Sequence, residues 1–372
     1  MDAAPLAFPV THKVPVTWIM RHGGPSIRLR LATEVFPGLV SDADVAGLRA
    51  EIANLQAVRQ IVKKQKDTGV WGGNLLGVAP NKTTGVKDVG TIPQFRRLLE
   101  LGVGREHRSI RVGTRVLYRL VSRDDDPKLL FEFEKFGVAA PGAEPWIRII
   151  VREAASAALA AAGFGDDPRV RGAAHKILNE VSTFLRSEAA QSPFVREGRS
   201  WVLNPAAYPP TVFSVSLLSR LPAVQRERAG LVERLASYLA APAPKKAFTV
   251  AAGKKSIRPT FLLLGDPLHV SAAGHPDDLP FALFWMEVLA RLGVLHTSST
   301  AGKIWQRLLK ERDDAGVWHP KNVRGIPKGA SPWAHHYFPL ETDAKTQESR
   351  LADVTFRMAL IGRLSGMEII QS

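Results

Sequence analysis

The sequence predicts an all-α protein, folded as an α/α toroid of repeated helical hairpins. Three observations lead to this prediction. Apolar residues recur at helical spacing along most of the chain, a segment that ends in Gly-Val-Trp occurs twice, and an apolar helix that ends at glycine occurs three times. Internal similarity of this kind is typical of proteins that stack one helical unit on the next.

The Gly-Val-Trp segment is the more specific repeat, and its two copies align without gaps over residues 61–71 and 308–318. Each copy reads as the end of an amphipathic helix followed by an acidic turn. Gly69 and Gly316 suit a backbone that leaves a helix through the left-handed conformation, which favours glycine. Trp71 and Trp318 can then fold back over the helix end, so we expect both to be buried at equivalent junctions between helices.

The second recurring unit is an apolar helix with a terminal glycine, found at residues 91–102, 279–293 and 355–366. Two further helices open alike, because Pro25 and Pro168 each begin a Pro-x-(Ile/Val)-Arg segment. Proline costs no hydrogen bond in the first turn of a helix.

These patterns predict helices over residues 25–36, 42–65, 91–101, 107–121, 145–162, 168–187, 211–220, 224–240, 279–292, 299–312 and 350–365. Residues 193–210 and 241–280 are rich in turn formers, which predicts irregular structure, with 260–264 as a short strand or a buried loop. No stretch reads as an interdomain linker. We therefore expect one repeat domain over residues 16–372, preceded by an N-terminal extension over residues 1–15.

Gln65, Gly69 and Trp71 stand in the order Gln-x-x-x-Gly-x-Trp behind an apolar helix, which resembles the Gln-Trp motif of the squalene and oxidosqualene cyclases. The second copy keeps the glycine and the tryptophan but has Arg312 in the glutamine position. By pattern, the resemblance to the squalene cyclase and prenyltransferase superfamily covers about residues 16–366. It implies a toroid with one central apolar cavity for an isoprenoid-like ligand.

The catalytic groups of that superfamily do not carry over. Cyclases of the squalene-hopene type use Asp-x-Asp-Asp, and the nearest segment here, Asp124-Asp125-Asp126 before Pro127, lacks that pattern and is typical of a turn. Protein prenyltransferases hold zinc with a cysteine, and this chain has none. We therefore expect no bound metal and no cofactor.

Composition suggests a second class of partner. Fifty Lys and Arg residues against 35 Asp and Glu give a formal charge of +15, which favours nucleic acid, anionic lipid or another acidic partner. The first ten residues do not read as a secretory signal, and the longest run of small apolar residues, 154–162, is too short to span a bilayer. A cytoplasmic protein without a transmembrane segment is expected.

One irregular segment after the second repeat turn gathers polar and aromatic residues. We predict that His335, His336 and Tyr337 line the cavity entrance as candidate proton-transfer groups, with His319 and Trp333 as ligand contacts. The alternative is an aromatic plug at the barrel rim.

Three arginines on helical patterns, Arg28, Arg96 and Arg357, could point inward and hold an anionic ligand, or point outward into solvent. We predict Arg357 as a ligand contact.

Three functions therefore compete. The first is the binding or transformation of an isoprenoid-like apolar ligand, which the resemblance implies. The second is nucleic-acid binding by a basic helical-repeat protein of HEAT type, which the charge of +15 favours. The third is a polysaccharide lyase on an α/α toroid, which depends on His335, His336 and Tyr337 alone.

Overall fold

The computed structural model describes residues 8–72, 75–76, 90–122, 143–204, 207–245, 247–252, 255–257, 261–320, 340 and 346–372. These residues are mostly helical, which confirms the all-α prediction at the level of secondary structure. Contacts group the chain into two compact units. Unit 1 comprises Met1–Gln65, Gln94–Ile110 and Leu268–Ser372, and unit 2 comprises Lys66–Pro93 and Arg111–Pro267. The toroid and the single repeat domain remain predictions.

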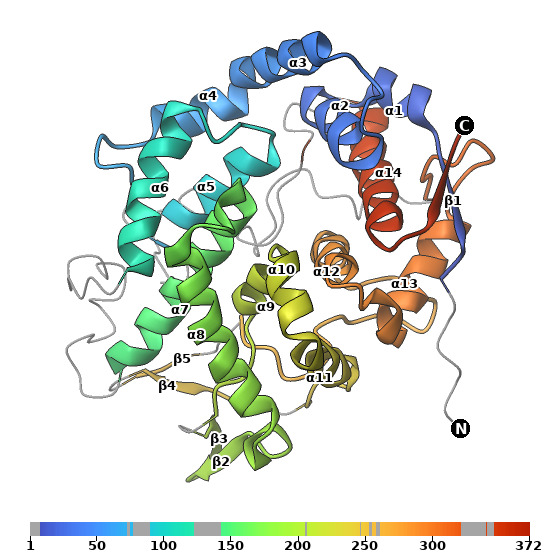
Figure 1. The fold of residues 1–372 in the computed structure, drawn as a ribbon. Helices are drawn as coiled ribbons and strands as arrows, with labels where there is room; N and C mark the ends of the chain where they lie inside the picture. The colour runs from blue at the N-terminus through green and yellow to red at the C-terminus, as the bar shows by residue number, and fades with distance from the viewer. Residues whose placement is uncertain are drawn as a thin grey trace. The chain divides into compact units, whose positions relative to one another are not determined.

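Unit 1 contains most of the helices from both ends of the chain. Its elements are β1 (Thr11–Val14), α1 (Val16–His22), α2 (Pro25–Arg30), α3 (Asp42–Asn54), α4 (Gln56–Lys63), most of α5 (Thr91–Glu100), α12 (Leu279–Arg291), α13 (Ser299–Lys310), α14 (Gln347–Leu364) and β6 (Glu368–Gln371). A π-helical turn, Leu31–Val35, extends α2. Within this unit α14 packs against α1, α2 and α12 (Figure 1). Every residue of α14 from Leu351 to Gly362 is buried, so this helix forms the centre of the unit's core.

The two strands of unit 1 pair in parallel, Thr11 opposite Glu368 and Val14 opposite Gln371. Side chains alternate along β1, with His12 and Val14 buried and their neighbours exposed. Val14 belongs to the apolar cluster that also contains Phe356 of α14. The paired strands therefore attach β1 to the central helix.

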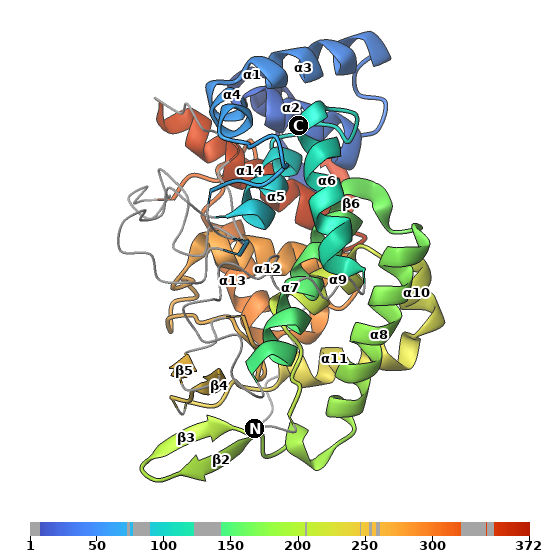
Figure 2. The same ribbon diagram turned by 90° about the vertical axis from the view of Figure 1, so that its left-hand side faces the viewer.

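Unit 2 is built from most of α6 (Arg108–Val121), with α7 (Ala143–Leu159), α8 (Pro168–Leu185), α9 (Val212–Ser219), α10 (Pro222–Glu227) and α11 (Ala229–Ala240). A π-helical turn, Ala160–Phe164, follows α7. Helix α7 packs against α8 and α9, and α8 packs against α11. The hairpin of β2 (Phe194–Glu197) and β3 (Ser200–Leu203) lies beside the hairpin of β4 (Val250–Ala252) and β5 (Lys255–Ile257), as Figure 2 shows. Residues 261–264 form a largely buried loop bridged to Thr211, rather than a strand of a sheet.

The two copies of the repeat turn have the same backbone conformation. Gly69 and Gly316 have φ values of 91° and 93°, and the N–H of each donates to the carbonyl oxygen three residues earlier, at 2.8 Å and 3.0 Å. The N–H groups of Lys66 and Asp313 each donate to the carbonyl oxygen four residues later, in both cases at 2.9 Å. The aligned segments 61–71 and 308–318 thus fold into one and the same turn.

The tryptophans that follow these turns are buried, with 2% of Trp71 and 3% of Trp318 exposed. The backbone N–H of Trp71 donates to Oγ1 of Thr91, and that of Trp318 donates to Oγ1 of Thr355, each at 3.1 Å. These two threonines open the aligned copies of the second repeat, residues 91–102 and 355–366. An equivalent hydrogen bond therefore joins the first repeat turn to α5 and the second repeat turn to α14.

The three copies of the glycine-terminated helix end in the same way. Their glycines have φ values of 90°, 72° and 78°, and each N–H donates to the carbonyl oxygen three residues earlier. The N–H of the next residue donates to the carbonyl oxygen five residues earlier, which completes a Schellman cap. The residues concerned are Gly102 with Val103, Gly293 with Val294 and Gly366 with Met367, and the second member of each pair is buried.

Among the described residues, no helix is both long enough and apolar enough to cross a membrane.

Candidate functional site

The predicted loop residues Trp333, His335, His336 and Tyr337 lie outside the described residues, so their roles remain predictions. His319 is described and is exposed, and its backbone N–H donates to the carbonyl oxygen of Glu311 at 2.7 Å. Within the described part of the chain, no three His, Asp or Glu side chains are arranged so that they could hold a metal ion.

At the glutamine position of the repeat motif, the side chain donates a hydrogen bond to a neighbouring backbone carbonyl oxygen in both copies. Nε2 of Gln65 donates to the carbonyl oxygen of Ser109 at 3.0 Å, at the start of α6. Nη1 of Arg312 donates to the carbonyl oxygen of Lys13 at 3.1 Å, in β1. A Cβ added to Gly316 would lie 3.2 Å from that same carbonyl oxygen, so this turn packs directly on β1. The substitution of arginine for glutamine therefore preserves a donor to a neighbouring backbone.

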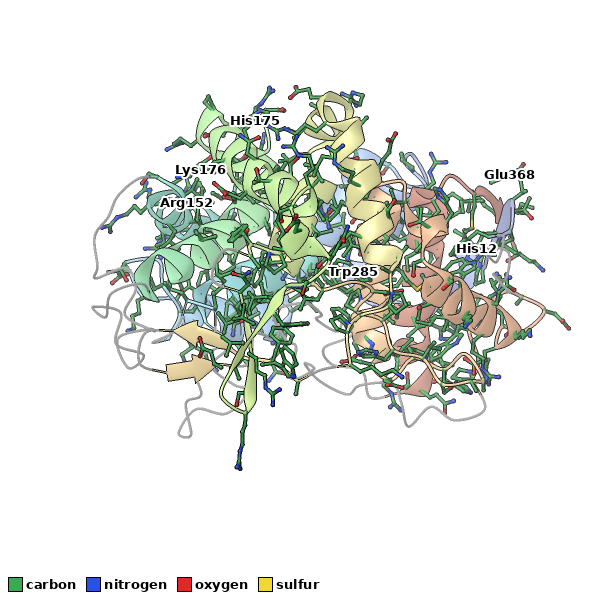
Figure 3. The ribbon with its side chains drawn as sticks, turned by 90° about the horizontal axis from the view of Figure 1, so that it is seen from below. His12, Arg152, His175, Lys176, Trp285 and Glu368 are labelled. Carbon is green, nitrogen blue, oxygen red and sulfur yellow. The ribbon has the colours of Figure 1, made fainter. Side chains whose placement is uncertain are left out.

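Beside Arg312, His12 of β1 is buried between this turn and α13. Its ring centroid lies 5.4 Å from that of Trp305, and its Nδ1 lies 3.4 Å from Nη1 of Arg312. Burial, together with the positive charge of Arg312, lowers the pKa of His12 to about 3. His12, which Figure 3 labels near Glu368 at the paired strands, is thus a neutral packing residue at physiological pH.

Among the described residues of unit 1, four helices each contribute one oppositely charged pair at positions i and i+4, and the eight side chains are buried or partly buried. We call these eight residues the charge cluster: Arg30 and Glu34, Arg96 and Glu100, Glu287 and Arg291, Asp353 and Arg357. The pairs come from α2 with its π-helical turn, from α5, from α12 and from α14. Three of these four helices are the copies of the glycine-terminated repeat.

Arg30 lies at the centre of the charge cluster. Its guanidinium nitrogens lie 2.6 Å from Glu34, 3.2 Å from Glu100 and 3.9 Å from Glu287. Its Cζ also lies 5.3 Å from the centroid of the Phe356 ring. One arginine of α2 thus contacts acidic side chains of three different elements.

The outer members complete the charge cluster. Arg291 lies 3.0 Å from Glu34, which joins α12 to the turn after α2. Arg357 is 3% exposed, and its guanidinium lies 2.7 Å from Asp353 and 3.8 Å from Glu100. The second carboxylate oxygen of Asp353 accepts the backbone N–H of Leu340 at 3.0 Å. Arg357 therefore points inward, and the ligand contact expected of it remains a prediction.

The charges of this cluster compensate one another. Burial alone would lower the pKa of Arg30, but Glu34, Glu100 and Glu287 outweigh it and raise that pKa above its ordinary value. Burial alone would raise the pKa of Glu34, but the ion pair and hydrogen bond with Arg30 keep that pKa below its ordinary value. Four arginines face four carboxylates, so the cluster has no net charge when all are ionised. Removing one partner from such a cluster would leave a buried charge uncompensated, which is strongly destabilising.

A different kind of site lies in unit 2, at the carboxyl group of Glu153 on α7. This side chain is completely buried. Oη of Tyr208 donates to Oε1 and Oγ1 of Thr211 donates to Oε2, each at 2.6 Å. Thr211 is the N-cap residue of α9, where its Oγ1 also accepts the backbone N–H of Ser214. We call Glu153, Tyr208 and Thr211 the Glu153 site.

Burial raises the pKa of Glu153 to about 7, although the hydrogen bonds from Thr211 and Tyr208 oppose the rise. Burial and the nearby carboxylate of Glu153 together raise the pKa of Tyr208 above its ordinary range. A carboxyl group that titrates near neutrality can both accept and release a proton at physiological pH. Among the described carboxyl groups, Glu153 combines complete burial with this property, which makes it the best candidate for acid–base chemistry.

Because the pKa of Glu153 is raised in the folded state, the group should make stability depend on pH. The folded protein then binds this proton more tightly than the unfolded chain, so the contribution is full below about pH 4.5 and is lost as pH rises through about 7. We expect Glu153→Gln to remove about 3 kcal/mol of this pH dependence, measured by urea denaturation between pH 4.5 and pH 8. Glu233→Gln, on the exposed face of α11, is the control. Parallel pH profiles for wild type and Glu153→Gln would contradict the assignment.

Comparison of the chain with protein-family models, with curated proteins and with solved structures finds no match.

Proposed function

We propose that this chain is a helical-repeat protein of the α/α type that binds an isoprenoid-like apolar ligand, as its resemblance to the squalene cyclases and prenyltransferases implies. The observation that carries the proposal is the equivalence of the two repeat turns. Both have a glycine at φ near 90°, a buried tryptophan and a threonine acceptor, and both place a side-chain donor on a neighbouring backbone. Repeats that agree at this level support the resemblance more strongly than their sequence spacing alone.

The side-chain donors of the two turns contact different neighbours in unit 1. The first turn places Gln65 on the start of α6, which is the next helical element described after α5. The second turn instead places Arg312 on β1, near the start of the described chain. This contact joins the second repeat turn to β1 within unit 1.

Within the proposed function, Glu153 is the described group suited to proton transfer. The carboxyl group lies on a helix whose neighbouring residues, Ala154 and Ala155, are completely buried and apolar, and Tyr208 is its hydrogen-bond partner. The entrance role of His335, His336 and Tyr337 remains a prediction, as does the lyase alternative that depends on them.

The proposal is tested by ligand identification. We expect organic extraction of the purified protein, followed by mass spectrometry, to yield an isoprenoid. We also expect added geranylgeraniol or squalene to raise the melting temperature, because a ligand present at 100 times its Kd stabilises the folded state by about 2.7 kcal/mol. Octadecanol, which is apolar but not an isoprenoid, is the control ligand. The proposal fails if no isoprenoid co-purifies and neither probe shifts the melting temperature more than octadecanol.

A further inference from the structure

Helix α6 carries an exposed row of arginines. Arg111, Arg115 and Arg119 are all exposed, and the helix contains no acidic residue. We call these three residues, which belong to unit 2, the arginine stripe. The opposite face of the helix is apolar and buried, with Ile110 and Leu117 completely inaccessible. The stripe thus lies on the outward-facing side of an amphipathic helix.

Helix geometry brings the stripe into one line. At 100° per residue, Arg111, Arg115 and Arg119 fall within an arc of about 80°, and successive members lie about 6 Å apart along the axis. Like charges at i and i+4 repel each other and destabilise a helix. A partner with regularly spaced negative charges would relieve the repulsion between these side chains.

Next to the arginine stripe, Arg169 lies against the ring of Tyr118. Cζ of Arg169, at the start of α8, lies 3.6 Å from the centroid of the Tyr118 ring of α6. The Arg169 side chain is 56% exposed, and Asp167 holds its guanidinium at 2.9 Å. Tyr118 also donates to Asp167, at 2.9 Å. The guanidinium is therefore held in place, with Asp167 as the acidic neighbour that positions it.

We propose that the arginine stripe, continued by Arg169, binds the phosphate backbone of a nucleic acid. Guanidinium groups bind phosphate oxygens in a bidentate manner, and the stripe repeats them along a line, as a polyphosphate backbone requires. A membrane surface fits less well, since an interfacial helix inserts its apolar face, and the apolar face of α6 is buried in the fold. The large apolar side chains that are exposed among the described residues, Val10 and Ile370, lie far along the chain from α6. This inference does not depend on the apolar ligand proposed above.

The test is fluorescence anisotropy with labelled 30-nucleotide single-stranded and duplex oligonucleotides of mixed sequence, at 50 mM and 200 mM salt. We expect the full chain to bind at 50 mM salt and to weaken steeply at 200 mM, because each neutralised phosphate releases counterions. Arg111→Gln/Arg115→Gln should weaken binding at least tenfold and reduce the slope of log affinity against log salt by about 2, about one unit for each lost contact. The control is Lys176→Gln/Arg226→Gln, which removes the same charge from exposed positions on α8 and α10 and should change affinity less than threefold.

Three results would overturn the proposal. The first is no binding of either oligonucleotide at 50 mM salt. The second is an equal loss in the two double variants, because binding would then follow net charge and not the stripe. The third is binding to phosphatidylserine vesicles that depends on Arg111 and Arg115 while neither oligonucleotide binds. Circular dichroism checks that both double variants are folded. If Arg111→Gln/Arg115→Gln does not fold, the single variant Arg115→Gln replaces it.

Discussion

Replacing Trp71 with alanine is expected to lower the free energy of unfolding by about 3–5 kcal/mol, as is usual for a large aromatic residue removed from a core. Trp318→Ala should have an effect of the same size, because the two residues have equivalent burial and equivalent hydrogen bonds to threonine. Both indoles are buried, so each substitution leaves a cavity that its neighbours cannot fill without moving. Chemical denaturation of the two variants measures both values.

Trp201→Ala is the matched control for this pair. Trp201 lies in the hairpin strand β3 and is only partly buried, so its loss should cost clearly less. A loss in either repeat variant no larger than that of Trp201→Ala would contradict the view that the repeat turns are structural junctions. Thr91→Val and Thr355→Val, which remove only the hydroxyl group, should each cost about 1 kcal/mol.

The second large effect is expected at the centre of the charge cluster. Arg30→Ala should lower the free energy of unfolding by about 3–5 kcal/mol, because it removes one partner of a buried ion pair network. The carboxylates of Glu34, Glu100 and Glu287 would then face one another with too little positive charge between them. Chemical denaturation at neutral pH gives this value.

Arg28→Ala provides the control, two residues away on the same helix. Arg28 pairs with Glu51 at the surface, with 29% and 52% of the two side chains exposed, and such pairs contribute about 0–1 kcal/mol. The double variant Arg30→Met/Glu34→Gln should recover part of the loss, because it removes charges of both signs. Equal costs for Arg28→Ala and Arg30→Ala would show that the charge cluster does not stabilise unit 1.

Most helices could be predicted from the sequence because the signals are local. Apolar spacing, N-terminal prolines and terminal glycines act within a few residues, and the glycine-terminated helices end where their glycines stand. Two predicted helices are interrupted where the backbone leaves the helical region, 42–65 at Leu55 and 224–240 at Arg228. Helix α1 was not predicted, because its seven residues are too few to show the helical period of apolar residues.

The two buried polar sites could not be predicted in the same way. A pair of opposite charges at i and i+4 is an ordinary feature of exposed helices, so nothing in one helix shows that four such pairs meet. Arg96 and Arg357 were candidates for inward orientation, and both lie inside, whereas Arg28 lies at the surface. Glu153 had only one signal, a single acidic residue just before a run of small apolar residues, and its partner Tyr208 lies 55 residues later in an irregular segment.

The division of the chain also has a consequence for how the protein folds. Most of unit 2 is one continuous stretch, Arg111–Pro267, whereas unit 1 joins segments on both sides of it. During synthesis, Arg30 and Glu34 leave the ribosome long before the residues of α12 and α14 that complete the charge cluster. Contacts of such high sequence separation form slowly, because a long loop must be closed first. We therefore expect unit 2 to acquire its core earlier than unit 1, which must wait for the segments of α12 and α14.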